Sequence, residues 1–307
     1  MSFNENVTLD TSQVRSGGGG GRGAPGGLVV GGGIGGIILL ILGLVFGIDP
    51  SQLPTGGGTS PFDTNQVQAA GDQDPNAFSE CRTGADANRS DVCRVVGTVN
   101  AVQAFWEGEL TRYKRRWQPT QTVLYDGATQ SACGTASNQV GPFYCPLDKQ
   151  VYIDASFFQV LTQQFGADSG ALAQEYVVAH EYGHALQDQL GLLGRAQQDP
   201  QGAESGSVKT ELMADCLAGV WVQHATTVPD SDTGTPYLEP LTDADIRSAL
   251  SAASAVGDDR IQQATSGRVT PETWTHGSSA ARQKWFLQGY RTGDLNQCDT
   301  FTGAPVE

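Results

Sequence analysis

The segment HEYGH, residues 180–184, constrains the fold of this chain more than any other segment. His180 and His184 are four residues apart, so on an α-helix they lie about 40° apart on one face, one turn along the axis. Two imidazoles in this arrangement can bind the same metal ion. Glu181 is offset by about 100° from His180, close to such an ion but off the line of its ligands. The segment therefore predicts a helix, over about residues 168–190, that carries two metal ligands.

A second motif can complete the site, because a catalytic zinc ion needs three protein ligands and an open position for water. In SVKTELMADCLAG, Glu211 and Asp215 are again four residues apart on a predicted helix. Asp215 can accept a hydrogen bond from the second ring nitrogen of a ligating histidine and so fix its tautomer. His224 lies about 220° around this helix from Glu211 and is not expected to be a ligand. The motifs together predict one Zn²⁺ ion with three ligands: His180, His184 and Glu211.

Glu181 is the candidate general base. Zinc lowers the pKa of a bound water to about 7, and Glu181 can accept its proton as the water attacks a carbonyl carbon, then return it to the leaving amine. Gly183, in the middle of the helix, costs about 1 kcal/mol relative to alanine, which indicates that another segment packs closely there. The alternative interpretation is that both motifs are ordinary polar helix faces. Their joint occurrence favours the metal site.

Residues 28–48, LVVGGGIGGIILLILGLVFGI, carry no charge. As a helix they would be about 31 Å long and would match the hydrocarbon core of a bilayer, which predicts one transmembrane helix. A cleaved signal peptide is the alternative, but the run is longer than a usual signal-peptide core and no A-x-A site follows it. Arg15 and Arg22 precede the run, and the next basic residue is Arg82. The positive-inside rule therefore predicts a cytoplasmic N-terminus and an extracytoplasmic domain.

Composition divides the remainder of the chain into three parts. Residues 1–27 contain a Gly-, Arg- and Pro-rich segment and are expected to be a disordered cytoplasmic tail. Residues 49–77 are rich in Pro, Gly, Asp and Gln and are expected to be a flexible linker. Apolar periodicity returns at residue 78 without a second long linker, so residues 78–307 are predicted to be one domain.

Within this domain, helical periodicity dominates and strand patterns are few. Short β-branched and aromatic runs predict strands at residues 122–126 and 150–154. Five helices are expected, over about residues 91–106, 168–190, 207–225, 242–264 and 278–292. The predicted fold class is α+β, mostly helical with a small β-sheet, preceded by one transmembrane helix.

Charge and cysteine content limit the partners and the chemistry. The formal net charge is −15 and no basic run occurs, so nucleic acid is not an expected partner. All six cysteines follow residue 48 and none has C-x-x-C spacing, so disulfides are expected rather than a cysteine zinc site. Six cysteines allow 15 pairings. Proximity along the chain favours two short-range pairs, which leaves one long-range pair: Cys133 with Cys145, Cys81 with Cys93, and Cys216 with Cys298.

The sequence resembles the bacterial neutral zinc metallopeptidase family, within the gluzincin type of zincin metallopeptidases. Besides HEYGH and ELMAD, the resemblance rests on these segments: CGTASNQVGPFYCPLDKQVYID (133–154), VGDDRIQQ (256–263), THGSSAARQKWFLQGY (275–290) and CDTF (298–301). It implies a zincin-like fold in a bacterial cell-membrane protein. It also implies the same roles for the site residues: His180, His184 and Glu211 as ligands, Glu181 as base, and Asp215 as the hydrogen-bond acceptor for a ligating histidine.

The family pattern draws attention to His276, in THGSS, whose imidazole could stabilise a developing oxyanion. The alternative is that His276 only begins the last helix. The expected function is a membrane-anchored zinc peptidase acting on extracytoplasmic proteins or peptides, which would pair with a sheet edge at Val151–Asp154. Two alternatives remain open: a non-catalytic anchored binding module with a structural zinc ion, and a cell-wall peptide hydrolase.

Overall fold

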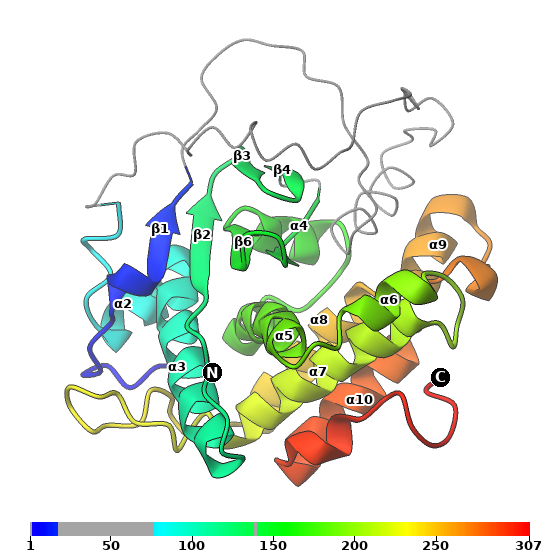
Figure 1. Cartoon of the computed structure of the whole chain (residues 1–307). Coiled ribbons are helices and arrows are strands. Elements are labelled where there is room, and N and C mark those ends of the chain that lie inside the picture. Colours follow the sequence, from blue (N-terminus) through cyan, green and yellow to red (C-terminus); the bar gives the residue numbers. More distant parts are fainter. Residues whose placement is uncertain (1, 18–76, 138–139) are drawn as a thin grey trace.

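The computed structural model describes residues 2–17, 77–137 and 140–307, which form a mostly helical body with small sheets (Figure 1). A four-stranded sheet has the order β1 (Val14–Ser16), β2 (Gln121–Tyr125), β6 (Gln150–Asp154), β5 (Phe143–Cys145). The first three strands are parallel, and β5 is antiparallel to β6. β3 (Ala128–Ser131) and β4 (Gly134–Ser137) form a separate hairpin. β6 pairs with β2 along its whole length and with β5 over Gln150–Tyr152, so the expected sheet edge at Val151–Asp154 is wrong. The two edges of this sheet are β1 and β5.

The helices have these bounds: α2 (Gly84–Arg89), α3 (Asp91–Arg112), α4 (Phe157–Gln163), α5 (Ala171–Gln189), α6 (Gly194–Gln198), α7 (Gly206–His224), α8 (Asp243–Ala255), α9 (Asp258–Ser266) and α10 (Ser279–Thr292). α5 contacts β5 and β6 as well as α7, and α7 in turn packs against α10 (Figure 1). The single helix expected over residues 242–264 is broken at Gly257. A Cβ atom there would lie 2.5 Å from the backbone nitrogen of Ser279, so only glycine lets the chain between α8 and α9 pass this close to the start of α10.

The N-terminal segment 2–17 is part of the hydrophobic core. Phe3 and Val7 are completely buried, and the Phe3 ring fills the space over Gly97 in α3. The Phe3 backbone N–H donates to the Asn88 side chain at 2.8 Å, and β1 extends the main sheet by pairing with β2. The expectation of a disordered tail over residues 1–27 is therefore wrong for this segment.

The predicted single-pass membrane topology is also wrong. A single crossing would place residues 2–17 and 77–307 on opposite sides of a membrane, whereas these residues share one core. Among the described residues, no helix combines the length and the apolar character needed to span a bilayer. Residues 28–48 and most of the expected linker lie outside the described residues. The structure thus gives no support to a preceding transmembrane helix, to a cytoplasmic N-terminus with an extracytoplasmic domain, or to a membrane partner.

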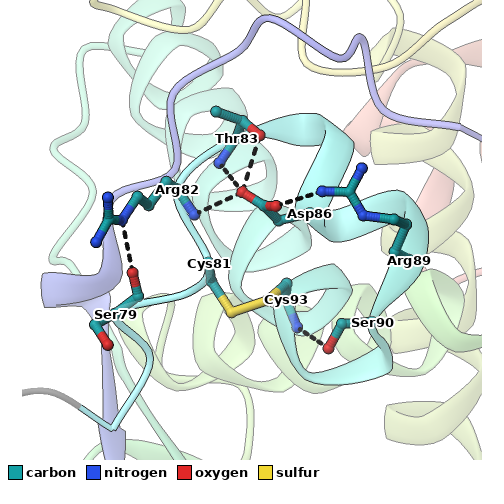
Figure 2. The surroundings of a disulfide bond; sticks show 8 residues. All are labelled: Ser79, Cys81, Arg82, Thr83, Asp86, Arg89, Ser90 and Cys93. Carbon is teal, nitrogen blue, oxygen red and sulfur yellow. Dashed lines mark hydrogen bonds and ion pairs between the residues drawn. A yellow bond between two sulfur atoms is a disulfide. The ribbon is translucent and has the colours of Figure 1, made fainter.

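The start of α3 is held by a disulfide and by a cluster of caps, shown in Figure 2. Cys81 is bonded to Cys93 in the first turn of α3. Asp86 accepts the backbone N–H groups of Arg82 and Thr83, at 3.1 and 2.9 Å, and so closes a capping box at the start of α2. Ser90 is the N-cap of α3, and its hydroxyl oxygen accepts the backbone N–H of Cys93 at 3.4 Å. This corner anchors the helix against which Phe3 packs.

The other two disulfides join the remaining expected pairs. Cys133 and Cys145 connect the turn of the β3–β4 hairpin to the edge strand β5. Cys216 and Cys298 connect α7 to the short 3₁₀-helix Leu295–Cys298 across 82 residues of sequence. All six cysteines are therefore paired, and none is left to bind a metal.

Glu175 in α5 gives a prediction about stability. Its carboxyl group is completely buried, and among the described residues neither oxygen has a hydrogen-bond partner. Burial raises the pKa of this group to about 7, although Arg94 acts in the opposite direction. The pKa of an unfolded glutamate is about 4.3, so the folded state favours the protonated form, and stability is lost as the pH rises through 7.

Glu175→Gln should therefore raise the free energy of unfolding by up to about 3 kcal/mol at pH 8 and by less than about 1 kcal/mol at pH 5. Urea unfolding of the full chain at both pH values measures this difference. An equal gain at both values would contradict the ionisation argument.

Candidate metal centre

Three buried side chains from α5 and α7 converge on one point. The Nε2 atom of His180 lies 3.1 Å from one carboxylate oxygen of Glu211, and the Nε2 atom of His184 lies 3.4 Å from the other. One ligand atom from each residue can be chosen so that all three lie within 4.8 Å of one another. Glu181 and His276 line the same cavity. The structure thus brings together the five residues that the sequence places at or near a metal.

Close packing of α5 against α7 permits this convergence. A Cβ atom on Gly183 would lie 3.2 Å from the Cα and the carbonyl oxygen of Ala214. The glycine between the two histidines therefore lets the backbone of α7 approach α5, as its position in the middle of a helix indicates. A larger side chain here would push Glu211 away from the histidines.

Gly183→Val should accordingly destabilise the protein by about 1–3 kcal/mol and weaken zinc binding, since overpacking a tight contact forces the helices apart. Gly108→Val is the matched control, because a Cβ atom added to that glycine in α3 would meet no packing partner within 4 Å in the described part of the chain. Thermal unfolding and zinc titration of both variants test the prediction. Similar effects of the two substitutions would show that the spacing of α5 and α7 does not control the site.

Each histidine is oriented through its other ring nitrogen. Asp215 lies 2.8 Å from Nδ1 of His180, and the side-chain oxygen of Gln187 lies 2.8 Å from Nδ1 of His184. Gln187 is fixed in turn because its amide donates to the Thr210 carbonyl at 2.7 Å. These contacts direct both Nε2 atoms towards Glu211, which is the arrangement that a metal ion requires.

Asp215 is held by two residues that the sequence analysis did not single out. Arg282, from α10, donates to its two carboxylate oxygens at 2.8 and 2.9 Å, and the Tyr176 hydroxyl donates to one of them. Burial opposes ionisation of Asp215, but Arg282 and His180 together hold its pKa below the usual value. The buried carboxylate thus stays charged and keeps its hydrogen bond to Nδ1 of His180.

Glu181 occupies a different environment from the ligands. Burial raises the pKa of its carboxyl group, although the two histidines and the backbone N–H of Tyr144 act against this shift. A raised pKa makes a carboxylate a better proton acceptor. Tyr144 belongs to β5, so the edge strand of the sheet lies beside the candidate base.

His276 is positioned by Asp258, at the start of α9. One oxygen of Asp258 accepts the backbone N–H groups of Thr275, His276 and Gly277, at 2.7, 2.7 and 3.1 Å. The other oxygen lies 3.4 Å from Nδ1 of the His276 ring. Burial lowers the pKa of His276, but Asp258 and Glu211 outweigh this effect and raise it. The Thr275 hydroxyl also lies 2.9 Å from Nδ1, so the orientation of the imidazole at the cavity wall is fixed from this side.

The donor set fits zinc. Two imidazole nitrogens and one carboxylate form one of the common three-ligand sets of catalytic zinc sites, in which a further position stays open. Both histidines already have their second nitrogens occupied, which leaves only the inward-facing atoms for a metal. His224, at the end of α7, instead contacts the Gly293 carbonyl at 2.9 Å and lies outside the site.

Comparison with known proteins agrees with this geometry. A family model described as "Putative neutral zinc metallopeptidase" matches residues 4–301. The chain belongs to this family. Its relatives include the uncharacterized protein Rv2575 of Mycobacterium tuberculosis, which is 55% identical over 306 residues, or 100% of each chain. The uncharacterized protein YpfJ of Escherichia coli is 37% identical over 276 residues, or 87% of this chain and 86% of YpfJ. No solved structure matches this family member, so the zincin-like fold stays a prediction.

Proposed function

We propose that this chain is a zinc-dependent peptidase in which His180, His184 and Glu211 hold the ion. The observation that carries the proposal is the convergence of these three side chains in a cavity that also exposes Glu181. A purely structural zinc site usually has four protein ligands. Among the described residues, two clusters of possible metal ligands occur. The other one, Glu80 with Cys81 and Cys93, is not a candidate because its two cysteines form a disulfide.

Each of the residues around the proposed zinc ion has its own role in the reaction. Bound zinc would supply Lewis acidity for a carbonyl group and for the attacking water. Glu181 accepts the proton of that water and passes it to the leaving amine. His276, which Asp258 holds in position, donates a hydrogen bond to the oxygen that becomes negative as the carbonyl carbon is attacked. Asp215 and Gln187 keep the imidazole rings in place during these steps.

The edge strand β5 offers a place for the substrate backbone. Phe143–Cys145 pairs with β6 on one side, and its Tyr144 N–H lies near Glu181. An extended peptide that adds to this edge would bring one of its carbonyl groups to the base. We therefore propose a peptide or protein substrate bound in extended form along β5.

The proposal is tested with the full chain stripped of metal and reloaded with zinc. One zinc per chain should bind, and cleavage of unfolded casein should appear on loading and disappear with a chelator. A chain that binds zinc and loses thermal stability on chelation, but cleaves neither casein nor peptidoglycan peptides, would contradict the proposal and favour a structural zinc ion. Cleavage of peptidoglycan peptides alone would identify a cell-wall peptide hydrolase instead.

A further inference from the structure

Residues 302–307, which we call the tail segment, have no part in the proposed chemistry. The family model matches residues 4–301, so the match assigns no role to this segment. Residues 302–305 are exposed, whereas Val306 is completely buried. Val306 belongs to an apolar cluster whose other buried members come from α7, from the residues before α10 and from α10 itself: Val208, Leu212, Trp274 and Ala281. One valine thus anchors a segment that otherwise lies outside the core.

Polar contacts hold the backbone on both sides of this valine. The carboxylate of Glu204, just before α7, accepts the backbone N–H groups of Val306 and Glu307, at 3.0 and 3.2 Å. The Val306 carbonyl accepts hydrogen bonds from Lys284 Nζ and Trp285 Nε1 of α10, each at 3.1 Å. This end of the chain, red in Figure 1, therefore lies against α10. Backbone hydrogen bonds together with one side chain in an apolar pocket are how proteins bind extended peptides.

Glu307 contacts the loop that carries His276, residues 275–278. One oxygen of its side chain accepts the backbone N–H of Ser278 at 2.9 Å, and a Cβ atom added to Gly277 would lie 2.9 Å from the same oxygen. Asp258 accepts the three preceding N–H groups of this loop, so Glu307 continues the same row of acceptors. Asp258 belongs to α9, whereas Glu307 is fixed to α10 and to the start of α7 through the residue before it. The tail segment thus connects the loop to elements that Asp258 does not reach.

We infer that the tail segment is a tethered peptide ligand, and that its docking keeps the loop of His276 at a fixed distance from the metal ligands. Leu212, a member of the Val306 cluster, directly follows Glu211 on α7. Val306 and Glu307 do not line the metal cavity, so they position the proposed oxyanion donor and do not react themselves. The inference rests on the proposed peptidase function and adds a positioning device to the same site. A displacement of about 1 Å can lower the rate of a positioned reaction about 100-fold, so loss of docking should lower kcat while zinc stays bound.

Two substitutions at Glu307 test the contact with the loop. The residue is exposed, so both full-length variants should fold. Glu307→Ala removes the acceptor for the Ser278 N–H and should speed hydrogen exchange of residues 274–279, and lower kcat on a casein-derived peptide, by at least about fivefold, the equivalent of one hydrogen bond. KM and zinc content should change less than about twofold. Glu307→Gln keeps an acceptor oxygen and should retain wild-type exchange and kcat. Wild-type exchange and kcat in both variants would overturn the inference.

A second experiment tests whether the tail segment acts as a ligand. Full-length Val306→Asp places a charge where the anchor docks and should lower kcat at least about tenfold at unchanged zinc content. A saturating synthetic peptide of residues 302–307 should restore kcat and slow the exchange of residues 274–279, whereas the same peptide carrying Val306→Asp should do neither. Val269→Asp, at a residue that is 37% exposed, is the matched control and should retain wild-type values. Wild-type kcat and exchange in folded Val306→Asp, or no recovery with the peptide, would overturn the inference. If circular dichroism shows that Val306→Asp is unfolded, the comparison of the two Glu307 variants still decides.

Failure of this inference can be told apart from failure of the proposed function, because hydrogen exchange requires no turnover. Faster exchange of residues 274–279 in Glu307→Ala, without any hydrolysis by the zinc-loaded wild type, would refute the peptidase function and support docking of the tail segment. Hydrolysis of casein at equal rates by the wild type and by Glu307→Ala, with equal exchange, would support the peptidase function and refute the positioning role.

Discussion

Glu181→Gln is expected to lower kcat on a casein-derived peptide by about 10²- to 10⁴-fold while the zinc content stays at one ion per chain. Glutamine has nearly the shape of glutamate but cannot accept a proton from water. The three proposed ligands and their hydrogen bonds do not involve Glu181, so zinc affinity should hardly change. Metal analysis and steady-state kinetics of the same preparation measure both quantities.

A matched substitution on the surface controls for a general effect of removing one negative charge on activity. Glu107 is exposed in α3, away from the cavity, and Glu107→Gln should retain wild-type activity. If Glu181→Gln kept activity within a few-fold of wild type, Glu181 could not be the base. If it lost zinc as well as activity, the residue would act in metal binding instead.

A chain that begins at residue 76 is expected not to reach the native fold, although it contains the entire predicted domain. Without residues 2–17, the main sheet loses β1 and the space over Gly97 loses the Phe3 ring. Phe3 is completely buried, and removal of this one buried phenylalanine side chain costs about 3–5 kcal/mol. That loss is a large part of the stability of a typical domain, about 5–15 kcal/mol.

The single substitution Phe3→Ala gives a graded form of this test. It should lower the free energy of unfolding by about 3–5 kcal/mol, whereas Ser12→Ala, at an exposed position of the same segment, should change it by less than about 0.5 kcal/mol. Urea unfolding followed by circular dichroism measures both. A synthetic peptide of residues 2–17 should restore structure to the truncated chain, and native stability of the chain without this peptide would contradict the prediction.

The metal centre could be predicted from the sequence because helical periodicity relates residues that are close together in the chain. His180 and His184, like Glu211 and Asp215, are one turn apart, so their shared faces follow from 3.6 residues per turn. The same reasoning extends to Tyr176, four residues before His180, and to Gln187, three residues after His184. These contacts were missed because tyrosine and glutamine are not among the residue types that usually bind zinc.

Contacts between distant segments of the chain could not be predicted from the sequence. Arg282 meets Asp215 across 67 residues, and nothing in the spacing of the two indicates that α10 crosses α7 at this point. The crossing depends on Gly219 and Gly289, where a Cβ atom would collide with the facing helix backbone. β5 was missed because three residues are too few to show alternation.

The prediction for the N-terminal region failed for a different reason. A glycine-rich composition and an uncharged apolar run indicated a tail and a membrane anchor, but composition averages over the short segment 2–17, which carries its own apolar residues. Phe3, Val7, Leu9 and Val14 are buried in the domain core. Their burial depends on partners far along the chain, which no local pattern can reveal.

The position of this segment also limits when the protein can fold during synthesis. The Asn4 backbone N–H donates to the Tyr237 carbonyl at 2.9 Å, and its side chain donates to the Pro236 carbonyl, 232 positions away. Residues 2–17 must therefore wait for a segment more than 200 positions later in the chain before all of their native partners exist. Because such distant contacts form slowly, part of the apolar surface of this segment stays exposed until these late partners have been made. A growing chain of this protein should therefore depend on chaperones until the loop at residues 236–238 has emerged.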